Sequence, residues 1–181
     1  PINVKYSFKN GSHLQAGAVL RNMYYKDEVE DKDRIVTGWG ASLSGIWQFA
    51  ENTSLCFQGV YGKGISNYIQ DISGSGLDLV PSATAEGKLK AFNAWGGYIG
   101  FSHNWSKVLT SNIMYSYARV LDRYGMPATS YKYAQYAAAN LFWDFSEYGS
   151  CAIEYVFGRR NDFNKDYGNA SRINTMIQYR F

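Results

Sequence analysis

Residues 2–9 read INVKYSFK, and this stretch decides the fold class. Its apolar and polar side chains alternate without exception, so Ile2, Val4, Tyr6 and Phe8 leave one face and the polar residues leave the other. Such alternation is the pattern of a β-strand with one apolar face. Asn10-Gly11-Ser12 then predicts a tight turn.

The same alternation recurs along the rest of the chain and predicts about nine strands, with no helix. In the third segment, for example, Trp39, Ala41 and Leu43 oppose the small side chains between them. After the first strand, the predicted segments lie at about residues 14–25, 35–50, 55–61, 95–105, 109–117, 133–145, 153–160 and 172–181.

The composition indicates strands with one apolar face and one face in contact with water. The chain has 181 residues with 16 Tyr, 10 Phe and 5 Trp, yet its mean hydropathy is only -0.34. No apolar run reaches the roughly 18 residues that a membrane-spanning helix needs, whereas strands of a membrane barrel need no such run. We therefore predict an all-β, transmembrane, antiparallel up-and-down β-barrel, with residues 1–181 in a single domain.

The predicted connections alternate between short and long. Short turns are expected at residues 10–12, 51–53, 106–107 and 146–149, and longer loops at 26–34, 63–88, a ten-residue segment containing Gly125 and Pro127, and 161–168. Membrane barrels have short periplasmic turns and longer extracellular loops, which orients the strands. The short-turn ends carry a predicted girdle of aromatic residues: Phe8, Trp47, Phe49, Phe57, Trp105, Trp143 and Phe145.

A soluble barrel of the lipocalin or avidin kind also alternates, with its apolar face inward. In that arrangement the bulky rings would lie inside and the small Gly and Ser side chains outside. A soluble barrel would not explain why short and long connections alternate or why aromatic residues gather at one end of the strands. The pattern therefore favours the bacterial outer membrane.

The chain is expected to be the C-terminal part of a larger barrel. Its last strand alternates up to Gln178-Tyr179-Arg180-Phe181, which resembles the C-terminal signal that the barrel-assembly machinery recognises. Single-chain bacterial barrels have an even number of strands, so nine implies earlier strands outside this sequence. No signal peptide precedes Pro1, and we expect a processed or cut N-terminus. If one strand is miscounted, a small closed eight-stranded structural barrel is the alternative.

Two segments resemble the DcaP-like trimeric porins. They are YGKGISNYI at residues 61–69, which leads from a strand into the largest loop, and IQYRF at residues 177–181. The resemblance covers the whole chain and the C-terminal half of that family's barrel. It implies a 16-stranded porin in a Gram-negative bacterium, a homotrimer, and uptake of small anionic organic solutes.

Strand parity identifies candidate pore-lining and substrate-binding residues. Guanidinium groups attract carboxylates and phosphates, and Arg21, Arg160 and Arg172 are expected nearer the extracellular ends. Glu154 and Asp144 are the carboxylates expected to neutralise them, which leaves an anion preference. The alternative is that these arginines pair with carboxylates of missing strands and only stiffen the wall. The residues expected to face the lumen are Lys5, Arg21, Arg160, Arg172, Arg180 and Glu154.

The predicted function is passive diffusion of small, hydrophilic, anionic solutes through an outer-membrane channel. An outer-membrane enzyme is a weaker hypothesis, because neither His13 nor His103 shares a rim with a nucleophile and a carboxylate, so no catalytic residue is expected. The net charge of +3 without a basic cluster argues against nucleic acid. Cys56 and Cys151 form no metal-ligand or redox motif, and we expect neither a metal nor a cofactor.

Two further patterns concern the surroundings of the pore. The acidic residues Asp27, Glu28, Glu30, Asp31 and Asp33 could hold cations that bridge lipopolysaccharide, but a solvated loop is the preferred interpretation. Outer-membrane lipid and lipopolysaccharide are expected around the barrel. The run Gly38, Gly40, Ser42 and Ser44 fills little space on the polar face, which favours a water-filled pore or a wall covered by an inserted loop.

Overall fold

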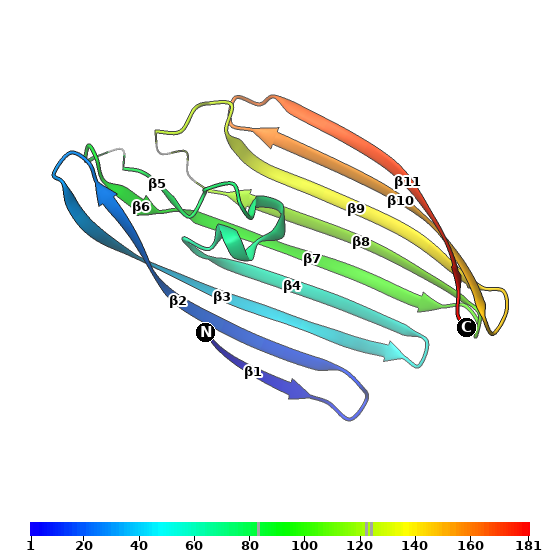
Figure 1. The fold of residues 1–181 in the computed structure, drawn as a ribbon. Helices are drawn as coiled ribbons and strands as arrows, with labels where there is room; N and C mark the ends of the chain where they lie inside the picture. Colours follow the sequence, from blue (N-terminus) through cyan, green and yellow to red (C-terminus); the bar gives the residue numbers. More distant parts are fainter. Residues whose placement is uncertain (83, 122, 124) are drawn as a thin grey trace.

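The structure, a computed structural model, describes residues 1–82, 84–121, 123 and 125–181. It is a single curved sheet of nine strands, every neighbouring pair antiparallel, in the order β1-β2-β3-β4-β7-β8-β9-β10-β11 (Figure 1). The strands are β1 (Ile2–Ser7), β2 (His13–Asp27), β3 (Lys32–Ala50), β4 (Thr53–Lys63), β7 (Asn93–Asn104), β8 (Leu109–Val120), β9 (Tyr131–Asp144), β10 (Gly149–Asp162) and β11 (Tyr167–Tyr179). The predicted all-β, up-and-down topology is confirmed.

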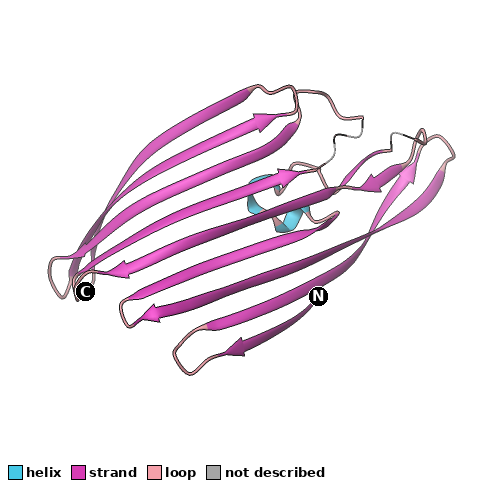
Figure 2. Cartoon of the chain, turned by 180° about the vertical axis from the view of Figure 1, so that it is seen from behind, coloured by secondary structure: helices cyan, strands magenta, loops and turns pink. Residues whose placement is uncertain are grey.

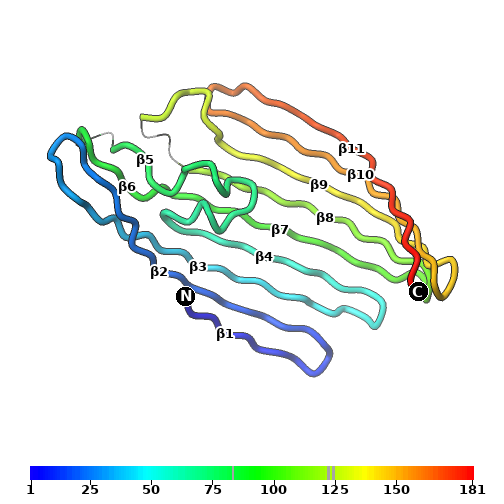
Figure 3. The backbone as a smooth tube through the Cα atoms, viewed as in Figure 1, coloured from blue at the N-terminus to red at the C-terminus, as the bar shows by residue number. Residues whose placement is uncertain are grey.

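The longest connection, residues 64–92, is called the inserted loop because it folds back over one face of the sheet (Figures 1 and 2). It contains two short 3-10 turns, η1 (Ser66–Tyr68) and η2 (Gln70–Ile72), and a small hairpin of β5 (Leu79–Pro81) with β6 (Leu89–Ala91). The backbone trace shows η1 and η2 lying across the middle of the sheet near β4 and β7 (Figure 3). Among the described residues, no helix is long and apolar enough to cross a membrane.

The opposite face of the sheet, called the outer face, exposes large apolar side chains along its strands. The register aligns them across neighbours, with Leu20 opposite Trp39 and Ile99 opposite Tyr115. Leu20 is 77% exposed and Ile177 is 85% exposed. In a water-soluble protein most large apolar side chains of a sheet would be buried. Exposed apolar residues over a whole sheet face fit contact with lipid.

The apolar core lies between the inserted loop and the other face, called the loop-covered face. Ile65, Ile72 and Phe92 of the loop are fully buried against it. The sheet contributes small or β-branched residues, so the loop packs close to the strands. The buried cluster consists of Ile65, Ile69, Ile72, Leu77, Val80, Phe92, Ala94, Ala118 and Val120.

Two of the predicted long loops are wrong in their bounds. Strand β2 continues to Asp27 and β3 begins at Lys32, because the Asp27 carboxylate holds the turn by accepting hydrogen bonds from the backbone N–H groups of Val29 and Glu30. Residues 163–166 likewise form a short turn, in which Lys165 has a positive φ of 74°. The longer connections are residues 64–92 and 121–130, and their positions 83, 122 and 124 lie outside the described residues.

The aromatic girdle at the short-turn end is confirmed, and a second belt lies at the other end. Phe8 and Trp47 meet at 5.7 Å between ring centroids in the first belt, and Trp95 and Tyr117 stack at 5.0 Å in the second. Trp95, near the start of β7, and Trp105, directly after its end, stand ten positions apart. At about 3.4 Å per residue and a tilt of about 40°, that separation gives a height of about 25 Å, the thickness of the apolar band of a membrane barrel.

Candidate pore site

Glycines on the loop-covered face let the inserted loop reach the strand backbone. A Cβ atom at Gly40 would lie 2.9 Å from Ile65 Cγ2, and one at Gly96 would lie 3.1 Å from Ile69 Cγ2. Any larger side chain at these two positions would push the loop off the wall. Of the two interpretations of the Gly38–Ser44 run, a water-filled pore or a wall covered by an inserted loop, the structure shows the covered wall at Gly40.

Arg21 of β2 fastens the loop to the wall. Its Nη1 donates to Asp78 Oδ2 at 2.9 Å and to the Gly64 carbonyl oxygen at 3.1 Å, and its guanidinium lies 5.8 Å from the centre of the Tyr68 ring. Ser66 Oγ donates to the second oxygen of Asp78 at 2.7 Å. Both members of the Arg21–Asp78 pair are largely shielded, with 26% and 15% of their side chains exposed.

The other two arginines of the predicted anion site are in different surroundings. Arg160 Nε donates to Asp162 Oδ1 at 2.9 Å and its guanidinium lies 5.7 Å from the centre of the Tyr131 ring. Arg172 lies opposite Val156 on the edge strand β11 and has no ion-pair partner within the described chain. The expectation that only Glu154 and Asp144 could neutralise these arginines is therefore wrong, since Asp78 and Asp162 pair with two of them.

The structure also keeps the three arginines apart. Arg21 and Arg160 are separated by six strand-to-strand steps, or about 29 Å along the sheet at about 4.8 Å per step. Arg160 lies opposite Gly168, four positions from Arg172 on β11, which is about 13 Å along the strand. Within this chain they do not form a single cluster.

Glu154 sits in a row of amides that crosses four strands of the loop-covered face. Asn112 Nδ2 donates to Asn140 Oδ1 at 2.8 Å, and Asn140 Nδ2 donates to Glu154 Oε2 at 3.3 Å. From the other side, Asn174 Nδ2 donates to Glu154 Oε1 at 2.9 Å. This amide row holds the carboxylate in the wall without a cationic partner in the described residues.

The remaining predicted residues, Lys5 and Arg180, lie on the two edge strands or beside them. Lys5 of β1 faces Gln15 in the register and makes no ion pair within the described chain. Arg180, just after β11, lies 3.8 Å from Asp144, with both side chains about half exposed. An exposed pair of this kind contributes little to stability.

Comparison with known proteins identifies the family. Residues 1–181 match the family model described as DcaP outer membrane protein. The chain belongs to this family. The crystal structure of the outer membrane channel DcaP of Acinetobacter baumannii is similar, with a TM-score of 0.79 and 19% identity over 99% of this chain and 50% of that chain. The NanC porin structure aligns with a TM-score of 0.48 and 12% identity over 99% of this chain and 91% of that chain. The search of curated proteins gives no significant match.

This membership confirms the predicted resemblance and places the protein in the bacterial outer membrane, in a family of porins and channels. The chain spans about half the length of the DcaP channel from Acinetobacter baumannii.

The acidic residues at the turn between β2 and β3 of this DcaP-family chain form ion pairs with neighbouring cationic side chains. Arg34 donates through Nε to Asp27 Oδ2 at 2.6 Å and lies 2.7 Å from Glu30, while Lys26 lies 2.7 Å from Asp31. The described residues contain no group of three or more His, Cys, Asp or Glu side chains arranged to hold a metal ion. These contacts favour a structured, solvated turn over a cation-bridging site.

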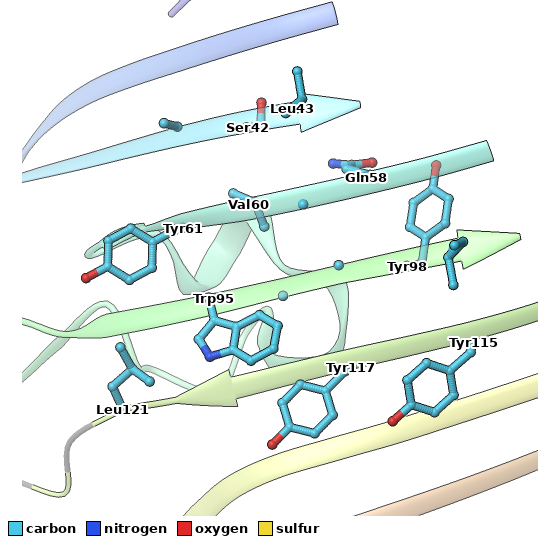
Figure 4. Close-up of a pocket in the computed structure, with 15 residues that line it drawn as sticks. Ser42, Leu43, Gln58, Val60, Tyr61, Trp95, Tyr98, Tyr115, Tyr117 and Leu121 are labelled. Atoms are coloured by element: carbon cyan, nitrogen blue, oxygen red, sulfur yellow. The ribbon is translucent and has the colours of Figure 1, made fainter. Parts of the chain in front are cut away.

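The outer face of the DcaP-family chain carries an apolar groove between β4 and β7. Gly59 and Gly97 face each other across these strands and leave bare backbone as its floor. Tyr61, Trp95 and Tyr117 stand around it (Figure 4). Because the groove is on the exposed apolar face, it belongs to the surface in contact with the membrane.

Proposed function

We propose that this protein forms a non-enzymatic, water-filled channel for passive diffusion of small hydrophilic solutes across the outer membrane. The observation that supports this proposal is the inserted loop, which packs against the inner wall of the sheet. The opposite, outer face exposes the apolar side chains that suit contact with lipid. A loop fixed against the inner wall narrows a passage without closing it, and pore-lining side chains then determine what passes.

The channel requires a closed wall, which we propose is completed by further strands. Both edge strands, β1 and β11, have unpaired backbone on one side, and unpaired edges do not persist in a hydrocarbon environment. Residues 1–181 would then be part of one larger barrel domain of 16 strands. A homotrimeric assembly, lipopolysaccharide contacts at the outer face, and recognition of β11 and Phe181 by the barrel-assembly machinery belong to the same proposal.

For selectivity, we propose a preference for anionic solutes that depends on Arg172 and Lys5. These two cations face the interior and lack an ion-pair partner in the described chain. A fixed charge without a counter-charge in a narrow aqueous passage raises the local concentration of ions of opposite sign. Arg21 and Arg160 contribute less, because each has a carboxylate 2.9 Å away.

The test is the reversal potential of the full-length channel in a planar bilayer under a potassium chloride gradient. The parent should prefer chloride, and the Lys5→Ser, Arg172→Ser double variant should lose most of that preference. Lys165→Ser, at the tip of an exposed turn, is the matched control and should leave the potential unchanged. A cation-selective parent, or a double variant that matches the parent, would contradict the anion preference.

A further inference from the structure

A cavity of about 530 Å³ lies between the tip of the inserted loop and the wall formed by β4, β7, β8 and β9. Its size falls in the range typical of small-molecule sites. Hydroxyl, amide and carboxylate groups converge on it from both the loop and the wall: Gln58, Tyr68, Asp71, Tyr98, Ser116 and Tyr136.

None of these six side chains forms a hydrogen bond or an ion pair with another side chain or the backbone in the described part of the protein. The neighbouring amide row shows the contrast, since Asn112, Asn140, Glu154 and Asn174 hydrogen-bond to one another in sequence. Polar groups that serve only the wall are thus paired there. The polar groups of the cavity are left available to a bound molecule and to water.

The lining combines flat rings with hydrogen-bonding groups, one of which is a carboxylate. Tyr68 and Tyr98 both line the cavity and are exposed, at 56% and 38%, so a ring and a hydroxyl group of each are accessible there. The Asp71 carboxylate accepts hydrogen bonds from hydroxyl groups, and the Gln58 amide both donates and accepts. None of the described residues lining the cavity is Lys, Arg or His, so nothing in it compensates an anionic group.

We propose that this cavity is a binding site for a neutral polyhydroxylated ring, such as a mono- or disaccharide, on the solute pathway. A sugar ring offers an apolar C–H face to an aromatic ring and a rim of hydroxyl groups to amides and carboxylates. The proposal rests on the proposed channel function. It is independent of the anion preference, because Arg172 and Lys5 do not line the cavity.

The experiment measures ion current through the full-length channel in a planar bilayer with maltose added at increasing concentration. Maltose should reduce the current in a saturable way beyond the effect of viscosity, which glycerol at matched viscosity reports. Tyr98→Ala and Asp71→Asn should each weaken this block at least tenfold. Tyr98→Phe, which keeps the ring and removes the hydroxyl group, should weaken it less than Tyr98→Ala.

Ser44→Ala is the matched control, since Ser44 lies on the loop-covered face outside the cavity. Maltose should block the current of this variant as strongly as that of the parent. Folding of each variant is checked by the heat-dependent shift in gel mobility and by unchanged current without sugar. Normal current with no saturable block, or block of Tyr98→Ala and Asp71→Asn as strong as that of the parent, would overturn the sugar site and leave the channel proposal intact. Absence of any current from the folded parent would overturn both.

Discussion

Arg21 and Asp78 are 57 positions apart in the chain, yet they form an ion pair of 2.9 Å that joins strand β2 to the inserted loop. Asp78 also accepts a hydrogen bond from the Ser66 hydroxyl, and Arg21 also donates to the Gly64 carbonyl oxygen, so the pair fixes the start of the η1 segment. Arg21 therefore positions the loop that narrows the proposed channel. The positive charge of Arg21 is largely neutralised by Asp78.

The first prediction concerns this Arg21–Asp78 pair. Arg21→Met should destabilise the docked loop by about 1–3 kcal/mol, because it leaves a shielded carboxylate without its strongest donor. The loop should then fluctuate, and single-channel current should become larger and noisier. Asp78→Asn should act in the same direction, and the double variant should cost less than the sum of the two.

Lys26→Met is the control for that experiment. Lys26 also forms an ion pair, with Asp31 at 2.7 Å, but their side chains are 63% and 82% exposed. Exposed pairs are worth little, so channel noise should not change. Additive effects of Arg21→Met and Asp78→Asn would show that the two side chains do not act as a unit.

A second prediction concerns the bare wall under the loop. Gly40→Val should displace the loop, since even its Cβ atom would meet Ile65 Cγ2 at 2.9 Å, and a cost of about 1–3 kcal/mol is expected for such overpacking. Limited proteolysis of the folded barrel should then cut within residues 64–92. Gly158→Val is the matched control on β10, where a Cβ atom would meet nothing within 4 Å. Equal resistance to protease in Gly40→Val and in the parent would rule out tight packing of the loop.

The number of strands and the separation of their faces could be predicted from sequence because both depend on alternation alone. Residues 2–9 and 172–181 show each face directly, and register adds nothing to that assignment. Loop bounds could not be predicted as well. The charged residues 26–34 suggested a long loop, but the Asp27 carboxylate supports a tight turn between extended strands.

The site was less accessible to prediction, because it depends on contacts between distant segments. Parity indicated that Arg21 faces inward, but nothing near it in sequence pointed to Asp78. The amide row requires the register between β8, β9, β10 and β11, which a single strand does not contain. The small residues at Gly40 and Gly96 were the one available signal that a loop covers the wall.

A third prediction concerns the carboxylate of the amide row. Glu154→Gln removes a negative charge and keeps the size of the side chain. Chloride preference should increase, seen as a larger reversal potential in the same salt gradient, because a fixed anion in the passage attracts cations. Folding stability should fall by about 1 kcal/mol, since an amide pairs less well with two donating amides than a carboxylate does. An unchanged potential would place Glu154 outside the conducting path.

The fourth prediction tests the two faces of the sheet. Ile99 is 49% exposed on the outer face, on β7 between the belts marked by Trp95 and Trp105. Ile99→Arg should cost about 2–4 kcal/mol, because that position is near the middle of the apolar band. Urea-induced unfolding in lipid vesicles, followed by the change in gel mobility, measures this difference.

Ser44→Arg is the matched change on the loop-covered face, where the side chain points to the proposed aqueous passage. A long cationic side chain can reach water there and keep its hydration, so a cost well below that of Ile99→Arg is expected. The assignment of faces rests on this contrast, because the same residue is introduced in the same sheet and only the medium differs. Equal destabilisation by the two variants would mean that both faces meet the same medium, which would exclude a lipid-facing outer side.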